Sequence, residues 1–243
     1  MADLRPLAVV TGGSRGIGRA FVLEAARRGY DVVFSYRSRE AEAAKTIELA
    51  AAFGGKIESV CADLEDFEGV RTVASAARAK GHASLLVNNA GIGEEFTLEE
   101  LTRAGWERSV AINLTAPTFL AKELKADLVS QRGAILNVSS DGGVAGSLHG
   151  APYGATKAGL IGLTKTLARE LAPHVRCNAI APGPVATEMW FAIDHAVQER
   201  VMQREMPLQR IAQPEDIARA GLDISSWPDA SGIVVLLDGG RIM

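Results

Sequence analysis

Seven short apolar runs alternate along the sequence with longer stretches of helical periodicity. The apolar runs lie at residues 7–11, 31–35, 57–62, 84–88, 133–139, 175–180 and 233–237. Runs of this kind are typical of strands that are buried on both faces of a parallel sheet. The β-α-β order therefore predicts an α/β fold, a doubly wound, Rossmann-like parallel sheet of about seven strands with helices on both faces.

The stretches between these runs have the apolar spacing of amphipathic helices. They lie at residues 16–28, 39–52, 67–79, 98–110, 116–131, 151–171 and 214–223, and a further helix is expected at 188–203. Gly29, the pair Gly54 and Gly55, and Gly81 stand where three of these helices should end. No linker, repeat or low-complexity segment interrupts the pattern, so residues 1–243 are expected to form one domain.

The composition narrows the classes of function. The chain has 243 residues, 47% of them hydrophobic, and a net charge of −3, which suits a domain with a sizeable core. No lysine or arginine block predicts a nucleic-acid interface. No apolar stretch approaches the roughly 20 residues that span a bilayer, and no signal segment precedes the first apolar run. A cytoplasmic protein without a membrane or nucleic-acid partner is expected.

The cysteines and histidines do not predict a metal site. Cys61 and Cys177 both lie in strand-like runs, where buried small hydrophobic residues are expected rather than a disulfide or redox pair. None of the four histidines has metal-ligand spacing with either cysteine; they are His82, His149, His174 and His195. We therefore expect no bound metal.

A glycine-rich segment, TGGSRGIG at residues 11–18, connects the first apolar run with the first helical stretch. Glycines permit a tight turn and let the backbone approach a pyrophosphate, which a helix N-terminus attracts. The spacing is T-G-x-x-x-G-x-G rather than G-x-G-x-x-G. The context predicts a dinucleotide site, and the alternative is a glycine-rich turn without a ligand.

The end of the second apolar run bears on the choice of cofactor. An acid at this position hydrogen-bonds the ribose 2′-hydroxyl of NAD, but this chain has Arg37 there and no acid before Glu40. Arg15 lies in the glycine loop, and two guanidinium groups can bind a 2′-phosphate bidentately. The pattern predicts NADP(H) in preference to NAD(H); otherwise Arg15 and Arg37 are ordinary surface arginines.

Asn88, Asn89, Ala90 and Gly91 follow the fourth apolar run. Ligands of doubly wound sheets bind beyond the carboxyl ends of the strands, near the point where the strand order reverses. The asparagine pair is therefore expected to tie neighbouring strand ends together and to line the adenosine side. A simple turn of Asn and Gly is the alternative.

Tyr153 and Lys157 begin the helical stretch 151–171, and their spacing of four places them on one helix face. A nearby ammonium favours the phenolate and is expected to lower the pKa of the tyrosine from about 10. Such a pair can exchange a proton with an alcohol or a carbonyl. The same spacing also occurs on solvated helix faces, so the pair is informative only beside the glycine loop.

Taken together, the motifs resemble the short-chain dehydrogenase/reductase family through nearly the whole chain. The matching residues occur in the family's order at 11–18, 88–91, Asn113, Ser140, Tyr153, Lys157 and 181–183. The resemblance implies a seven-stranded sheet and an NADP(H)-dependent oxidoreductase that interconverts a carbonyl and a secondary alcohol. Ser140 has the family's spacing from Tyr153, and Ser139 is its neighbouring rival.

The resemblance also implies a role for each catalytic residue. Tyr153 is the general acid in reduction and the general base in oxidation. Lys157 hydrogen-bonds the nicotinamide ribose and lowers the pKa of Tyr153. Ser140 hydrogen-bonds the substrate carbonyl, and Asn113 holds a water that links Lys157 to solvent. For Asn113, a helix-kinking or capping amide is the alternative.

The implied cofactor site extends over both halves of the sheet. Asp63 is expected beside the adenine, and Pro182, Gly183, Val185 and Thr187 around the nicotinamide carboxamide; a cap aspartate and a proline–glycine turn are the alternatives. The residues predicted to bind the cofactor are Gly12, Ser14, Arg15, Gly16, Ile17, Gly18, Arg37, Asp63, Leu64, Asn89, Ala90, Gly91, Tyr153, Lys157, Pro182, Gly183, Val185 and Thr187.

The sequence encodes the substrate poorly. The segment 188–204 is expected to cover the site as a lid, and its cluster of Met189, Trp190 and Phe191 favours a partly apolar substrate or simply packs the lid. The nearest pattern resembles 3-oxoacyl-[acyl-carrier-protein] reductases, although basic residues near the entrance are few and Asp238 departs from the usual Asn-Gly-Gly. A different small ketone, polyol or quinone is the alternative, as is a non-catalytic NADPH-binding regulator.

Assembly into a homotetramer is expected by the same resemblance, through helices 116–131 and 151–171 and the C-terminal strand. The second helix has surplus small or apolar residues, which a partner subunit would explain. They are Ala155, Ala158, Gly159, Ile161, Gly162 and Leu163. Burial of this helix within its own subunit is the alternative.

Overall fold

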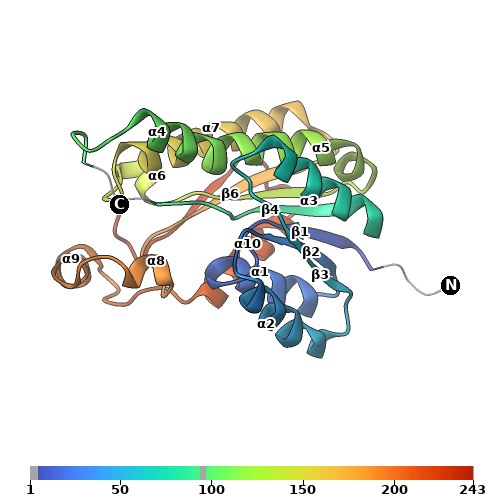
Figure 1. Cartoon of the computed structure of the whole chain (residues 1–243), viewed down its shortest axis with the longest axis horizontal. Coiled ribbons are helices and arrows are strands. Elements are labelled where there is room, and N and C mark those ends of the chain that lie inside the picture. Colours follow the sequence, from blue (N-terminus) through green and yellow to red (C-terminus); the bar gives the residue numbers. More distant parts are fainter. Residues whose placement is uncertain (1–4, 94–96, 243) are drawn as a thin grey trace.

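The computed structural model describes residues 5–93 and 97–242, and its strands form one parallel sheet (Figure 1). The sheet order is β3-β2-β1-β4-β5-β6-β7, and every neighbouring pair is parallel. The predicted doubly wound, Rossmann-like fold is therefore confirmed. The strands are β1 (Leu7–Val10), β2 (Asp31–Tyr36), β3 (Ile57–Cys61), β4 (Ala83–Asn88), β5 (Ala134–Val138), β6 (Arg176–Pro182) and β7 (Val234–Leu237).

Helices cover both faces of this sheet (Figure 1). One face carries α1 (Gly16–Arg27), α2 (Glu40–Ala50) and α10 (Pro214–Ser226), and the other carries α3 (Phe67–Lys80), α5 (Ala116–Ser130) and α7 (Ala151–Glu170). The strand order reverses between β1 and β4, so the ligand crevice of such a sheet lies beyond the carboxyl ends of these strands. None of the described helices has the length and apolar character that a bilayer span requires.

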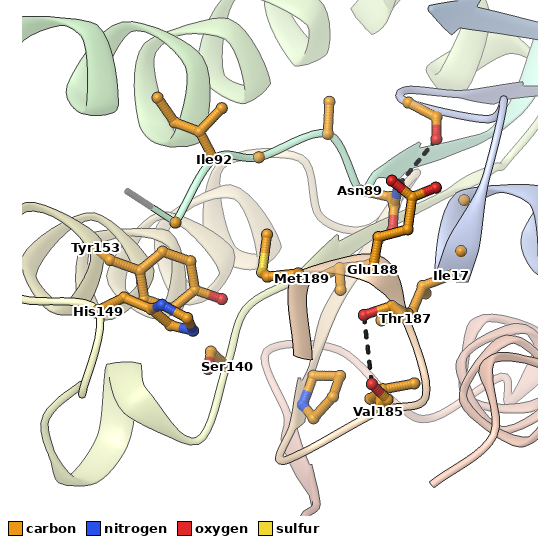
Figure 2. A pocket seen from close by; sticks show the side chains of 18 of the residues that line it. Ile17, Asn89, Ile92, Ser140, His149, Tyr153, Val185, Thr187, Glu188 and Met189 are labelled. Atoms are coloured by element: carbon orange, nitrogen blue, oxygen red, sulfur yellow. Dashed lines mark hydrogen bonds between the residues drawn. The ribbon is translucent and has the colours of Figure 1, made fainter. Parts of the chain in front are cut away.

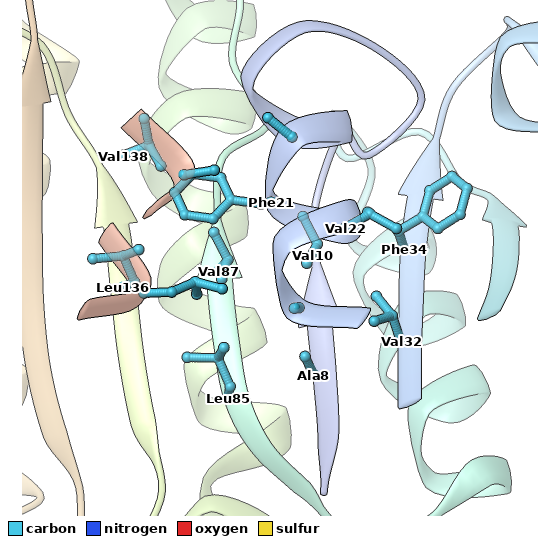
Figure 3. Packing of buried hydrophobic residues seen from close by; sticks show 14 of the residues in the cluster. Ala8, Val10, Phe21, Val22, Val32, Phe34, Leu85, Val87, Leu136 and Val138 are labelled. Atoms are coloured by element: carbon cyan, nitrogen blue, oxygen red, sulfur yellow. The ribbon is translucent and has the colours of Figure 1, made fainter. Parts of the chain in front are cut away.

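Each face of the sheet has its own apolar core because the strands bury side chains in both directions. On the face of α1, Phe21 is fully buried and lies over Val87 and Leu136 (Figure 3). Gly221 of α10 allows the helix to approach, since a Cβ there would lie 2.9 Å from the Phe21 ring. The opposite core includes Leu86, Leu124 and Ile135 among other buried residues. Burial on both faces holds the strand ends in fixed positions.

Several helices differ from the predicted bounds. Helix α4 (Arg103–Val110) begins later than expected because Thr102 caps it, with the hydroxyl oxygen accepting from Gly105 N at 3.0 Å. A π-helical turn, η2 (Ala111–Thr115), joins α4 to α5. The helix expected at 39–52 ends in a short 3-10 turn, η1 (Ala51–Phe53), and one short helix was not predicted, α6 (Gly142–Ala145) after β5.

The helix expected at 188–203 is divided into three pieces: α8 (Glu188–Phe191), α9 (His195–Arg200) and the π-helical η3 (Val201–Glu205). Asp194 interrupts the run and caps α9, because its carboxylate accepts from the next two free backbone N–H groups. An isolated β-bridge between Val185 and Ala212 joins the two ends of the segment that contains these three helices. We call residues 188–206 the lid.

Cys61 is exposed, contrary to the prediction that both cysteines are buried. It is the last residue of β3, which forms one edge of the sheet, so no further strand covers it. Its thiol donates a hydrogen bond to the Arg37 carbonyl at 3.1 Å. Cys177 in β6 is buried as expected, and burial raises the pKa of its thiol to about 12.

Candidate active site

A cavity of about 760 Å³ lies at the carboxyl ends of the strands. Every residue that the sequence analysis assigned to the cofactor lines it, from Gly12 in the glycine loop to Thr187 at the start of the lid. Figure 2 shows its two ends: Tyr153, His149 and Ser140 lie at one, and Asn89, Ile17, Thr187 and Glu188 at the other. Met189 lies between them. The topology therefore brings together residues that are far apart in the sequence.

The glycine loop forms a cradle that side chains would fill. Gly12 and Gly16 have φ of 70° and 53°, in the region that favours glycine. A Cβ on Gly18 would lie only 2.0 Å from the Gly12 carbonyl oxygen. Helix α1 has no side-chain cap at its N-terminus, so its first N–H groups face the cavity without a side-chain partner. These features fit the pyrophosphate of a dinucleotide.

The asparagine pair ties strand ends together as predicted. Asn89 donates through Nδ2 to the Thr11 carbonyl at 2.9 Å, and the Thr11 hydroxyl oxygen accepts from the Asn89 backbone N–H at 3.0 Å. Asn88 donates to the Asn137 side chain at 2.8 Å, which joins β4 to β5. The cradle after β1 is thereby held against the loop after β4.

Arginines gather at the end of the cavity that follows β2. Arg15, Arg37 and Arg39 all line it. Glu188 of the lid forms ion pairs with Arg15 and with Arg39, the latter at 3.2 Å. The cluster is consistent with the predicted 2′-phosphate site, but Arg39 and its partner Glu188 were not among the predicted residues. Arg39 could have been predicted from the sequence, because it lies two positions after Arg37 at the end of the same strand.

At the other end, Ser140 faces Tyr153 (Figure 2). Burial raises the pKa of the Tyr153 phenol, and the hydrogen bond between the two side chains offsets a part of that rise. The hydroxyl of Ser139, the rival residue, instead donates to the Lys157 backbone carbonyl at 2.8 Å. The structure therefore favours Ser140 as the serine of the site. The His149 ring lies edge-on to Tyr153, with centroids 5.1 Å apart.

Burial dominates the titration of the Tyr153–Lys157 pair. It raises the pKa of Tyr153 to about 12, against the predicted lowering, because an ionised phenol loses its hydration in this site. Burial also lowers the pKa of Lys157 to about 8. The Lys157 ammonium lies 5.6 Å from the centre of the Tyr153 ring and donates to the Val138 carbonyl at 2.8 Å. The phenol is thus protonated at neutral pH.

Asn113 is fully buried in the π-helical turn η2 and does not line the cavity. Its side-chain oxygen accepts from Ile92 N at 2.9 Å, and its Nδ2 donates to Ile92 O at 3.0 Å and to the Thr156 hydroxyl at 3.1 Å. The amide therefore fixes the loop after β4 against α7. Its predicted role in holding a water stays a prediction.

The apolar cluster of the lid divides between two tasks. Trp190 is 8% exposed and packs with Val201 and Met206 into a small core of the lid. Met189 is 40% exposed and lies in the cavity between its two ends (Figure 2). Phe191 is exposed and does not line the cavity. Trp190 thus packs the lid and also lines the cavity together with Met189, whereas Phe191 does not line it.

Three titratable residues near Ser140 and Tyr153 line the site without having been predicted there: His149, Asp141 and Arg241. Asp141 follows Ser140 directly, and an acid beside a site serine was a usable signal. No sequence signal pointed to Arg241, because only the tertiary structure brings the segment after β7 to the cavity. Within the described part of the chain, no three His, Cys, Asp or Glu side chains gather as a metal site requires.

A family model described as short chain dehydrogenase matches residues 6–198 of the sequence. The seven-stranded sheet, the glycine cradle and the Ser140–Tyr153–Lys157 end of the cavity agree with this match. The protein belongs to the short-chain dehydrogenase family and is an oxidoreductase.

Curated relatives are similar over nearly their full lengths. The 3-oxoacyl-[acyl-carrier-protein] reductase FabG of Staphylococcus aureus is 34% identical over 241 residues, which cover 97% of this chain and 98% of the relative. A 3-oxoacyl-[acyl-carrier-protein] reductase of Synechocystis is 35% identical, with 98% and 97% covered.

Solved structures share the fold. A blue fluorescent protein from a metagenomic library, in complex with NADPH, has a TM-score of 0.91 and 31% identity, with 98% of both chains covered. L-sorbose reductase from Gluconobacter frateurii, complexed with NADPH and L-sorbose, has a TM-score of 0.91 and 29% identity, with 98% of this chain and 96% of that chain covered.

Proposed function

We propose that the protein interconverts a carbonyl and a secondary alcohol with NADP(H), and that Ser140, Tyr153 and Lys157 carry the proton transfer. The observation that carries this proposal is the cavity itself. One of its ends is a glycine cradle without side chains, and the other presents a hydroxyl, a phenol and an amine.

NADP(H) supplies or accepts the hydride when it is bound. The cradle of Gly12, Gly16 and Gly18 would hold its pyrophosphate, and the predicted residues around Asp63 and Thr187 would hold the adenine and the carboxamide. This assignment is supported by the cavity that these residues share. The relatives crystallised with NADPH have the same fold, which supports the choice of cofactor.

Tyr153 donates the proton in reduction. Its pKa of about 12 keeps the phenol protonated at pH 7, so the donor is present before the substrate arrives. The Ser140 hydroxyl donates to the Asp141 carboxylate in this structure, and it would turn to the carbonyl oxygen as a second donor when negative charge develops there. Lys157, with a pKa of about 8, holds an exchangeable proton at Nζ near neutral pH. In oxidation the same groups act in the opposite direction.

Preference for NADP(H) over NAD(H) is supported by the arginine cluster. Arg15, Arg37 and Arg39 line the end of the cavity where a 2′-phosphate would lie, and no acid follows β2 before Glu40. Glu188 pairs with two of these arginines. Its carboxylate therefore competes with a phosphate for the same donors, and a dianionic phosphate is the stronger ligand of two guanidinium groups.

For the substrate we propose a 3-oxoacyl thioester or a similar carbonyl compound with an apolar substituent. The named function of the Staphylococcus and Synechocystis relatives supports this class. Met189 and Leu148, 40% and 50% exposed, line the cavity and offer apolar surface to such a substituent. A polyol or small ketone, as in L-sorbose reductase, is the competing class.

The test measures NADPH oxidation with acetoacetyl thioesters, β-keto esters, α-diketones, quinones and L-sorbose. The thioesters and β-keto esters are expected to give the highest kcat/KM. Tyr153→Phe should lower kcat by about 10² to 10⁴ while NADPH still binds, because it removes only the positioned proton donor. A Tyr153→Phe variant that retains most of the activity on the best substrate would contradict the mechanism. Binding of NADPH without turnover of any carbonyl would favour the regulator.

We further propose a homotetramer that uses α7. Ala155, Ala158 and Gly162 on this helix are exposed in the single chain, so its own subunit does not cover them. This surface of small side chains allows close approach of a two-fold related helix. The cytoplasmic location expected from the composition stays a prediction.

A further inference from the structure

Asp141 follows Ser140 in the loop after β5 and is 6% exposed. Its Oδ1 accepts hydrogen bonds from the Ser140 hydroxyl at 3.0 Å and from the Gly142 backbone N–H at 2.6 Å. The Ser140 oxygen itself accepts from the same Gly142 N–H at 3.1 Å. A buried carboxylate therefore accepts the proton of the hydroxyl that faces Tyr153 (Figure 2) and sets its orientation until a substrate oxygen competes for that proton.

The second oxygen of Asp141 accepts a hydrogen bond from Nη1 of Arg241 at 2.7 Å. Arg241 lies in the turn after β7. The Asp238 carboxylate fixes this turn by accepting from Gly240 N at 3.0 Å and Ile242 N at 2.8 Å. The turn thus places a guanidinium group in the wall of the cavity.

The remaining donors of Arg241 reach the lid. Its Nε and Nη2 donate to Oε2 of Glu205, the last residue of η3, at 2.9 and 2.7 Å. The side chains of Arg241 and Asp141 are 20% and 8% exposed. Because both side chains are largely buried, removal of either partner would leave the other charge with little hydration and would destabilise the site.

The Asp141 carboxylate acts on Tyr153 by its charge. Burial is the largest cause of the raised pKa of Tyr153, and the Asp141 charge raises that pKa further. A cation that pairs with Asp141 reduces its effect. The other titratable groups near Tyr153 among the described residues are His149 and Lys157. The remaining charged side chains of the cavity lie toward its other end: Arg15, Arg37, Arg39, Asp63 and Glu188.

We propose that Asp141 and Arg241 are positioning residues for the Ser140–Tyr153 pair: the carboxylate fixes the serine hydroxyl, and the guanidinium offsets the negative charge beside the proton donor. This inference rests on the proposed function, because it takes Tyr153 as the group that transfers the proton. The C-terminal turn is thereby a part of the active site, and Glu205 connects it to the lid.

The test is the pH dependence of alcohol oxidation, which requires the phenolate. Asp141→Asn keeps an oxygen that accepts from Ser140 but removes the negative charge, so that the Arg241 cation is offset by Glu205 and no longer by Asp141. The midpoint of its profile should fall by roughly one pH unit. Arg241→Gln leaves the carboxylate unopposed, so its midpoint should rise. The double variant should lie between the two single variants, and Arg241→Lys, which keeps the cation, should restore the parent midpoint.

Arg204→Gln is the matched control, because this exposed arginine adjoins Glu205 and its loss changes the net charge equally. Absorbance of the Tyr153 phenolate, measured as the difference from Tyr153→Phe, gives the same midpoints without a substrate. A parent that reduces no carbonyl would end the proposed function, and this titration would still decide the inference.

Two results would overturn the inference. In the first, Asp141→Asn and Arg241→Gln shift the midpoint in the same direction. In the second, neither shifts it more than Arg204→Gln does. If Arg241→Gln does not fold, the double variant replaces it. The midpoint of the double variant should then lie closer to that of the parent than the midpoint of Asp141→Asn does. If the double variant has the same midpoint as Asp141→Asn, Arg241 has no such role.

Discussion

Replacing Lys157 by methionine is expected to stabilise the protein at pH 7 while it removes the proposed activity. Lys157 is 4% exposed, and no carboxylate of the described residues pairs with it. Burial of the amine without a counter-ion lowers its pKa from 10.5 to about 8. The fold therefore bears the cost of a buried cation whenever the pH is below that value.

The lowered pKa sets the magnitude. At pH 7 the charged amine is less favourable in the folded than in the unfolded chain by about 3 kcal/mol. The penalty is complete below the folded pKa of about 8 and disappears as the pH rises through the unfolded value of 10.5. At pH 10 less than about 1 kcal/mol remains. Methionine keeps most of the aliphatic stem and carries no charge at either pH.

The assay is urea denaturation of parent and variant at pH 7 and pH 10. The Lys157→Met variant also loses the hydrogen bond to the Val138 carbonyl, which costs about 1–3 kcal/mol but does not depend on pH. The difference in unfolding free energy should therefore change by roughly 2–3 kcal/mol between the two pH values, with the larger advantage of the variant at pH 7.

Lys165→Met is the control, since Lys165 lies on the same helix but is exposed. Its difference from the parent should be the same at both pH values. A Lys157→Met difference that is also independent of pH would refute the reasoning, because it would mean that the amine keeps its hydration in the folded protein.

Three further predictions concern the cofactor, the assembly and the core. Arg37→Asp should shrink or reverse the preference for NADPH over NADH, and Glu188→Gln should tighten NADPH binding by up to roughly tenfold at low salt, because exposed pairs contribute about 0–1 kcal/mol each; equal dissociation constants of the parent for both cofactors would reject the preference. Gly162→Glu should dissociate the assembly in sedimentation, since a Cβ at Gly162 meets no atom within 4 Å in its own subunit; a parent that sediments as a monomer would contradict the tetramer. Phe21→Ala should lower the unfolding free energy by about 3–5 kcal/mol in urea denaturation, whereas Phe191→Ala, at an exposed position, should change it little; equal effects would contradict the proposed core.

The segments of the sheet and the glycine cradle followed from local sequence patterns. Seven apolar runs predicted seven strands because a parallel strand buries consecutive side chains, and every run forms a strand. The glycine spacing predicted the cradle, and the structure gives the reason for that spacing: a Cβ at Gly18 would collide with the Gly12 carbonyl oxygen. The spacing of Tyr153 and Lys157 fixed their common helix face in the same way. In each case the constraint acts between residues that are close along the chain.

Other features depended on contacts between distant segments. Cys61 was expected inside, but β3 is an edge strand, and only the strand order decides which strand is at the edge. The lid was expected as one helix, but Asp194 caps a new helix within it. The raised pKa of Tyr153 opposes the expected lowering, because desolvation depends on everything packed around the ring and not on Lys157 alone.

The sequence by itself determined the family of folds, the glycine cradle and the common helix face of Tyr153 and Lys157, since periodicity and short spacings are properties of neighbouring residues. Ser140 followed from the resemblance to the family, with Ser139 as its rival. Only the tertiary structure decided that Arg241 pairs with Asp141 across 100 positions of sequence, and that Glu188 of the lid lies against Arg15. Such pairs arise where parallel strands end at one edge of a sheet, and the path of the chain between those ends leaves no periodic trace in the sequence.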